Sequence, residues 1–244
     1  MTSANFQQYK VWDLPTRVFH WVNFTTIIGL IIMGLIMLFK KEIGITGIDA
    51  KVGLKEIHVF IGYVFALNLI WRILWGFIGN KYARWSNILP HKGFIKIVKD
   101  YVLSVKSGDA EQYIGHNPLG RLAITFILLL LIILAATGLV RAGTDIYYPP
   151  FGSLVVDYII EPGVDPDNIM PYVAEGTDPD KVSSLKAFKG PFGKVHLYSS
   201  YILMFMIVLH IFFVVRAEVK EGGSLISAMF TGKKILTKKP VDTD

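Results

Sequence analysis

Residues 195–215 read VHLYSSYILMFMIVLHIFFVV and carry no Asp, Glu, Lys or Arg. Apart from the tyrosines, the ionisable side chains of this run are His196 and His210. A helix of about 20 residues rises about 30 Å, which is the hydrocarbon thickness of a bilayer. A transmembrane strand needs only about ten residues and alternates apolar with polar side chains, which this run does not do. The stretch therefore predicts a membrane-spanning helix that holds two histidines.

Three further runs have the same character. Residues 18–39 and 122–140 contain no acid, lysine or arginine, and residues 57–78 contain one such side chain, Arg72. The whole chain is 52% hydrophobic and only 18% charged, whereas soluble domains carry about 25% charged residues. We predict an all-α membrane protein, a bundle of four transmembrane helices that forms a single membrane-embedded domain over residues 1–244.

The composition also limits the chemistry. The chain has no cysteine, which excludes disulfides, thiolate metal sites, iron–sulfur clusters and covalently attached haem. The formal net charge is +6, but in a membrane protein such a surplus reflects basic loops on the cytoplasmic side rather than nucleic-acid binding. Histidine, methionine and carboxylate remain as possible metal ligands, and any haem must be held non-covalently.

The charges of the connecting segments predict the topology. Lysine and arginine predominate in residues 80–121 and at both termini, whereas residues 142–194 carry eight acidic residues and four lysines. By the positive-inside rule, both termini and the 80–121 connection are cytoplasmic, and the long 142–194 loop is periplasmic. The short 40–56 loop is mixed in charge and argues weakly for the opposite orientation. We expect the long loop to be an ordered cap with little regular structure.

Four of the six histidines lie inside the predicted spans. His196 and His210 are 14 residues apart on one helix, so they share a face and are separated by about 21 Å along the axis. If the helices alternate in direction, His20 has the depth of His210, and His58 has the depth of His196. Two histidines on facing helices at one depth are the axial ligands that a six-coordinate haem iron needs. The alternative is that they only bond across helices, but ionisable groups within a membrane are usually functional.

Several other residues are candidates for the same sites. Haem propionates are carboxylates and need cationic partners. We assign Arg17 and Arg72 to the haem of His20 and His210, with lipid headgroups as the alternative partner of both arginines. Arg141 and Lys194 are the corresponding candidates on the outer side. For proton exchange with a quinone at the inner end, the sequence offers Asp13, His116, Glu218 and Glu221.

These motifs resemble a known family. The run VWDLPTRVFHW at residues 11–21 is similar to the start of the bacterial di-haem cytochrome b proteins, the cytochrome b561-type group that includes the cytochrome b subunit of nickel–iron hydrogenases. WR at 71–72, GFIG at 76–79, YAR at 82–84, GHNPLG at 115–120 and EGGSLISAMFTG at 221–232 also fit. The resemblance implies a four-helix bundle that carries two bis-histidine haems b in a bacterial inner membrane.

The implied function is electron transfer between the membrane quinone pool and a periplasmic partner. That partner is a c-type cytochrome or a hydrogenase, and we take the long 142–194 loop to favour the cytochrome because it is not expected in a hydrogenase subunit. One alternative keeps the haems but makes the chain a stand-alone quinone reductase that oxidises a small substrate such as superoxide. Another is a proton or ion transporter that contains no haem.

Overall fold

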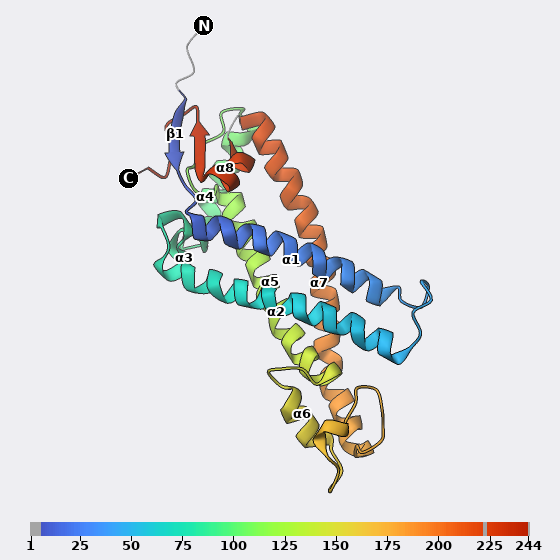
Figure 1. Cartoon of the computed structure of the whole chain (residues 1–244). Helices are drawn as coiled ribbons and strands as arrows, with labels where there is room; N and C mark the ends of the chain where they lie inside the picture. Colours follow the sequence, from blue (N-terminus) through green and yellow to red (C-terminus); the bar gives the residue numbers. More distant parts are fainter. Residues whose placement is uncertain (1–5, 222–223, 244) are drawn as a thin grey trace. The chain divides into compact units, whose positions relative to one another are not determined.

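The structure is a computed structural model that describes residues 6–221 and 224–243, without the side chains of Lys220 and Glu221. Gly222 and Gly223 of the 221–232 motif, and the side chain of Glu221, therefore lie outside the described residues. Four helices are long and apolar enough to cross a membrane, which confirms the predicted fold class. They are α1 (Leu14–Leu38), α2 (Ile48–Ile78), α5 (Pro118–Ile146) and α7 (Pro179–Glu221) (Figure 1).

The helices extend beyond the predicted spans. Helix α2 begins at Ile48, before the span predicted from 57, and α7 begins at Pro179, before the span predicted from 195. Hydropathy detects only the apolar part of a helix, whereas local capping sets where it starts. The Asp178 carboxylate accepts hydrogen bonds from the backbone N–H groups of Asp180 and Lys181 at 2.9 and 3.2 Å, directly before a proline at the first helical position. Both features are typical of a helix N-terminus.

The chain divides into two compact units, and each long helix contributes residues to both. Unit 1 comprises Met1–Val22, Asn68–Leu129 and Leu203–Asp244, and unit 2 comprises Asn23–Leu67 and Leu130–Ile202. The shorter elements of unit 1 are β1 (Gln7–Lys10), η1 (Lys81–Ala83), α3 (Trp85–Ile88), α4 (Phe94–Lys106), α8 (Leu225–Thr231) and β2 (Lys233–Leu236). Those of unit 2 are α6 (Gly152–Ile159) and η2 (Pro166–Asn168).

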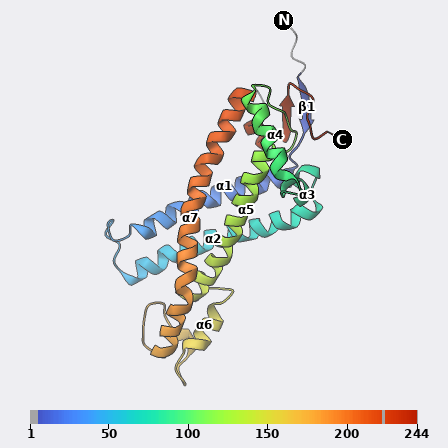
Figure 2. The same cartoon turned by 180° about the vertical axis from the view of Figure 1, so that it is seen from behind.

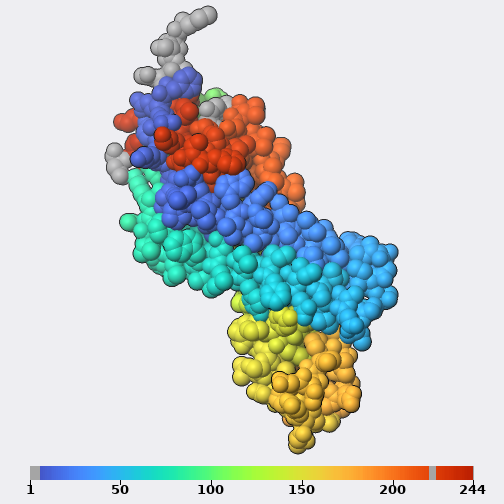
Figure 3. Space-filling view, viewed as in Figure 1, coloured from blue at the N-terminus to red at the C-terminus, as the bar shows by residue number. Residues whose placement is uncertain are grey.

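In unit 1 the two ends of the chain pair with each other. Strands β1 and β2 form an antiparallel two-stranded sheet in which Gln7 faces Leu236 and Lys10 faces Lys233, and the blue and red segments lie together in Figure 3. The sheet continues into a small core that contains Val11, Ile114, Ala228 and Leu236. Residues that are far apart in the sequence therefore pack together in unit 1.

Helix α4 lies in the connection between α2 and α5, and it is labelled in Figure 2. Its residues Phe94 and Tyr101, seven positions apart, are buried, while Ile95 is 87% exposed. Lys96, Lys99 and Lys106 are also exposed. The predicted basic connection therefore contains an amphipathic helix whose exposed face carries three lysines.

The long loop in unit 2 is shorter and more regular than predicted. Helix α5 continues to Ile146 and α7 starts at Pro179, so both ends of the 142–194 segment are helical. Between them, α6 buries Val155 and Ile159 against Ile169, and Ile160 forms an isolated bridge with Thr177. The apolar side chains of α6 supply a local core, which the expectation of little regular structure did not include.

Candidate functional site

His58 of α2 and His196 of α7 face each other in unit 2. Their ring centroids are 6.3 Å apart, with an angle of 70° between the ring planes. An imidazole nitrogen binds a metal ion at about 2.0 Å, and the ring centre lies roughly 1 Å beyond that nitrogen. Two imidazoles on opposite sides of one iron therefore have centroids about 6 Å apart, so the observed spacing fits axial ligation of a haem iron.

The hydrogen bonds of His196 indicate which ring nitrogen is available. The hydroxyl of Thr137 on α5 donates to the carbonyl oxygen of Ile133 at 2.7 Å and lies 2.9 Å from Nδ1 of His196. Because the hydroxyl proton is already used, Thr137 accepts from an Nδ1–H group, which leaves Nε2 unprotonated and able to bind a metal. Nδ1 of His58 is buried and has no hydrogen-bond partner in the described part of the chain.

Two glycines open space beside these rings. A Cβ atom on Gly138 of α5 would lie 3.3 Å from Cε1 of His196, and one on Gly34 of α1 would lie 4.0 Å from Cε1 of His58. A methyl group at Gly138 would crowd the His196 ring, whereas one at Gly34 would make an ordinary van der Waals contact with the His58 ring. Small residues beside the two rings suit either close helix packing or the close approach of a flat macrocycle.

His20 of α1 and His210 of α7 both belong to unit 1. Both are partly buried, and they are close enough to interact electrostatically. Nδ1 of His20 is buried and has no partner among residues 6–221 and 224–243, while the Trp21 ring meets the His20 ring edge-on at 5.3 Å. The predicted pairs are thus divided between the units, one pair in each.

The two arginines assigned to the inner haem have different environments. Arg72 is 4% exposed and donates from Nη2 to the carbonyl oxygen of Ala83 at 3.0 Å. Its guanidinium lies 4.9 Å from the Trp85 ring, and its Nη1 is buried without a partner within the described residues. Such an orphaned cationic donor suits a carboxylate ligand.

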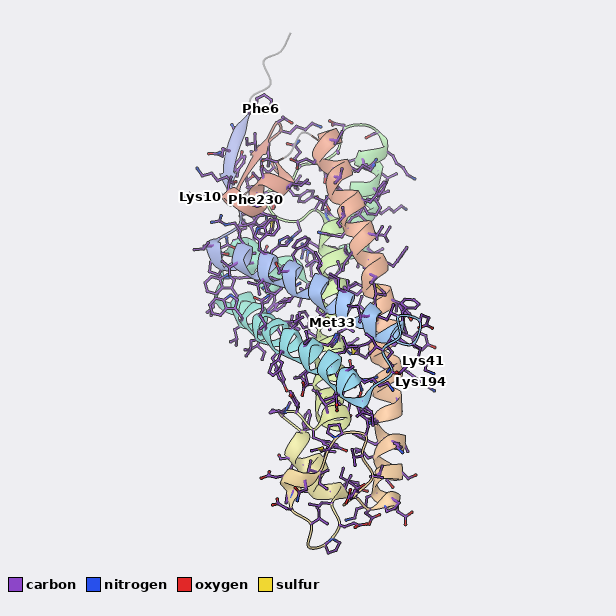
Figure 4. All side chains as sticks on the ribbon, turned by 45° about the vertical axis from the view of Figure 1, so that its right-hand side comes forward. Phe6, Lys10, Met33, Lys41, Lys194 and Phe230 are labelled. Atoms are coloured by element: carbon purple, nitrogen blue, oxygen red, sulfur yellow. The ribbon has the colours of Figure 1, made fainter. Side chains whose placement is uncertain are left out.

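Arg17 has a partner that the sequence did not suggest. It donates from Nη1 to the carbonyl oxygen of Phe230, which Figure 4 labels on α8. Its Nε is buried with no partner in the part of the chain that the structure describes. Arg17 therefore fixes α8 against α1, and its buried Nε–H can still donate to a further anion.

The outer cations form a different set from the one expected. Arg141 bonds to Asp145 at 2.7 Å, and Asp145 also contacts Lys55 at 2.6 Å and Lys189 at 2.9 Å. Lys194, which Figure 4 labels on α7, is exposed. Asp145 was counted with the solvated acids of the outer loop, but it lies in α5 with its side chain 9% exposed. Lys55 and Lys189 were missed, although they lie three and seven residues before His58 and His196.

The candidates for proton exchange have structural partners. Asp13 accepts from the Thr16 backbone at 3.1 Å and from Nε1 of Trp75 at 3.0 Å, and Glu218 accepts from the Leu225 backbone at 2.5 Å. The His116 ring lies 4.6 Å from the Trp12 ring. Burial, together with the nearby charge of Lys234, lowers the pKa of His116 to about 3. His116 is therefore neutral at physiological pH.

Comparison with known proteins identifies the family. The family described as prokaryotic cytochrome b561 matches residues 11–232, which is most of the chain. The chain belongs to the prokaryotic cytochrome b561 family. Membership implies haem b and electron transfer across a membrane, and it gives no support to a transporter without haem.

Curated relatives of this b561 protein are named probable Ni/Fe-hydrogenase B-type cytochrome subunits. The one from Rhizobium leguminosarum bv. viciae is 24% identical over 94% of this chain and 90% of its own length. Those from Azotobacter vinelandii and Escherichia coli K12 are 25% and 23% identical, over 91% and 94% of this chain and 86% and 92% of their own lengths. No solved structure matches.

These alignments also bear on the long loop of the b561 protein. An alignment that covers 94% of the chain includes most of residues 142–194. The relatives therefore give no support to treating this loop as a departure from the hydrogenase-type cytochromes, which was the reason for preferring a c-type cytochrome as partner.

Proposed function

We propose that this chain is a di-haem electron carrier of a bacterial inner membrane. His58 and His196 hold one haem b and His20 and His210 hold the other, and both termini are cytoplasmic. The observation that carries the proposal is the 6.3 Å spacing of the His58 and His196 rings, together with the Thr137 contact that leaves one His196 nitrogen available. A bound haem b supplies a reversible one-electron couple at each pair.

The residues around each pair have separate roles in this proposal. Thr137 orients the His196 ring and keeps its proton on Nδ1. Gly34 and Gly138 leave room beside the ligands, and Arg72 offers a buried N–H to an inner propionate. The inner pair exchanges electrons with quinone near the cytoplasmic surface, and the outer pair exchanges them with a periplasmic partner.

We propose a Ni/Fe-hydrogenase as that partner. The names of the relatives support this choice over a c-type cytochrome. In membranes that contain the hydrogenase, addition of hydrogen should then reduce the b haems of this chain, as seen in their absorption bands. The same membranes with the His58→Ala variant should lose that reduction. Haems that stay oxidised under hydrogen, but are reduced through a c-type cytochrome, would contradict the hydrogenase assignment.

The haem assignment is tested by a reduced-minus-oxidised spectrum with a haem count on the purified chain. We expect two haems b in the unchanged protein and one in each of His58→Ala and His20→Ala. His91→Ala is the matched control, because His91 is exposed and its ring contacts only the backbone carbonyl of Lys92 and the edge of Phe94 among the described residues, so it should retain both. One haem in the unchanged chain would refute the pairing, and none would refute the proposal.

A further inference from the structure

The ion cluster around Asp145 is not explained by ligation of iron. Three cations, Lys55, Arg141 and Lys189, approach this carboxylate within 2.6 to 2.9 Å. They come from the three helices α2, α5 and α7. The Asp145 side chain is 9% exposed, and those of Lys55, Lys189 and Arg141 are 21%, 26% and 36% exposed. The carboxylate is therefore withdrawn from water, and the three cations around it are partly exposed.

Its charges do not balance. Three cations and one carboxylate leave a surplus of two positive charges, and unpaired charge in a partly buried membrane site is costly. No second carboxylate forms an ion pair with these cations in the described part of the chain. Glu56, the neighbour of Lys55, instead accepts a hydrogen bond from the Tyr148 hydroxyl at 2.8 Å. Two negative charges are thus missing.

The cations lie on the helix faces that carry the haem ligands. Lys55 is three residues from His58 on α2, and Lys189 is seven residues from His196 on α7. Residues spaced by three or seven positions share a helix face. Arg141 is three residues from Gly138, which lies against the His196 ring. A Cβ atom on Gly193, one turn from His196, would lie 2.5 Å from Nη1 of Arg141.

We propose that Lys55, Arg141 and Lys189 bind the two propionate carboxylates of the haem held by His58 and His196. The two carboxylates supply the two missing negative charges. Asp145 holds the three cations together and repels the propionates moderately, so it is a positioning residue and not a ligand. This inference rests on the proposed function, because it requires a haem at the outer histidine pair.

The competing explanation is that the cluster only ties α2, α5 and α7 together. The two explanations rank the substitutions in opposite order. If the cluster is purely structural, Asp145→Asn is the most damaging change, because it weakens all three ion pairs at once. If the cations bind propionates, Asp145→Asn removes a repulsive charge, whereas Arg141→Gln and Lys189→Gln remove attractive ones.

The experiment compares these three variants in the full-length haem-loaded protein. Lys186→Gln is the matched control, since Lys186 is an exposed lysine three residues before Lys189 on the same helix. Two quantities are measured for each haem: its midpoint potential and its rate of transfer to excess apomyoglobin. The haem of His20 and His210 serves as an internal reference for correct folding.

We expect Arg141→Gln and Lys189→Gln to lower the outer midpoint potential, because a nearby cation favours the iron state with the extra electron. Loss of the outer haem should become about 10- to 100-fold faster, as for loss of a charge-assisted hydrogen bond. Asp145→Asn should raise the outer potential and retain the haem. Lys186→Gln should change neither quantity.

The inference is overturned if the two cation variants behave like Lys186→Gln, or if Asp145→Asn loses the outer haem faster than Lys189→Gln does. If Asp145→Asn does not fold, the two cation variants decide the outcome alone, provided that their inner haem is unchanged. An unchanged protein without an outer haem would instead refute the proposed function. If the unchanged protein holds two haems but the cation variants change neither the outer midpoint potential nor the rate of haem loss, only the propionate site is refuted.

Discussion

The hydroxyl of Thr137 lies 2.9 Å from Nδ1 of His196 and 2.7 Å from the carbonyl oxygen of Ile133. Nothing in the sequence marks this threonine, since it lies in an uncharged run far from any histidine along the chain. Its role follows from the neighbouring helix, because a ligand's second ring nitrogen usually has a partner that fixes its proton and orientation.

At the residue scale we therefore predict that Thr137→Val weakens the outer haem site. The substitution keeps the shape of the side chain but removes the hydroxyl oxygen that accepts from the Nδ1–H group of His196, and changes of this type typically cost about 10- to 100-fold in affinity. The measurement is haem binding to the purified apoprotein, followed by absorption. Thr144→Val is the control, because the Thr144 hydroxyl bonds to the carbonyl oxygen of Val140 at 2.9 Å within α5. Equal affinities in the two variants would contradict the role of Thr137.

At the scale of secondary-structure elements, the C-terminal end of α2 packs closely against the short helix α3. A Cβ atom on Gly76 would lie 2.2 Å from the Trp85 ring, so the helix requires glycine here. Nε1 of Trp85 donates to the carbonyl oxygen of Ile73 at 3.1 Å, and the ring lies under the Arg72 guanidinium at 4.9 Å. The packing of α3 thus supports the environment of Arg72.

We predict that Gly76→Ala destabilises unit 1 by about 1–3 kcal/mol, since the ring of Trp85 must move to admit the methyl group. The free energy of unfolding in detergent, followed by the absorption of the haem of His20 and His210, measures this. Gly53→Ala on the same helix is the comparison, because a Cβ atom at Gly53 meets nothing within 4 Å. That change should be neutral or stabilising by up to about 1 kcal/mol. A Gly76→Ala protein as stable as the Gly53→Ala protein would show that Trp85 is not held in place.

For the whole molecule, the orientation in the membrane is a prediction that rests on charge alone. The absence of cysteine allows single cysteines to report which side a segment occupies. Lys92 and Asp157 are both exposed, one in the 80–121 connection and one in α6. By the positive-inside rule, Lys92→Cys should be cytoplasmic and Asp157→Cys periplasmic.

We therefore expect a membrane-impermeant maleimide to label Asp157→Cys in intact spheroplasts, and to label Lys92→Cys only in inverted vesicles. The unchanged chain, which has no thiol, gives the background. The reverse pattern would place both termini outside and would assign the pair His58 and His196 to the cytoplasmic side.

The sequence by itself determined the four spans, because the length of an apolar run is a local property that a bilayer selects directly. It also indicated the histidine pairs, since the 14-residue spacing of His196 and His210 follows from helix geometry and the order of the spans. The family resemblance, which depends on motifs along the whole chain, was likewise available from the sequence and was confirmed by the family match.

Only the tertiary structure decided the partners of these residues. Asp145 belonged by sequence to an acidic loop, yet it bonds to Lys55, 90 residues away. Arg17 bonds to Phe230, 213 residues away, and β1 pairs with β2 from the other end of the chain. Such contacts have no local signal, because they depend on which helix faces meet after the chain has folded. The proposed histidine pairs follow from helix spacing and the order of the spans, whereas the hydroxyl beside His196 and the cations around Asp145 follow from packing.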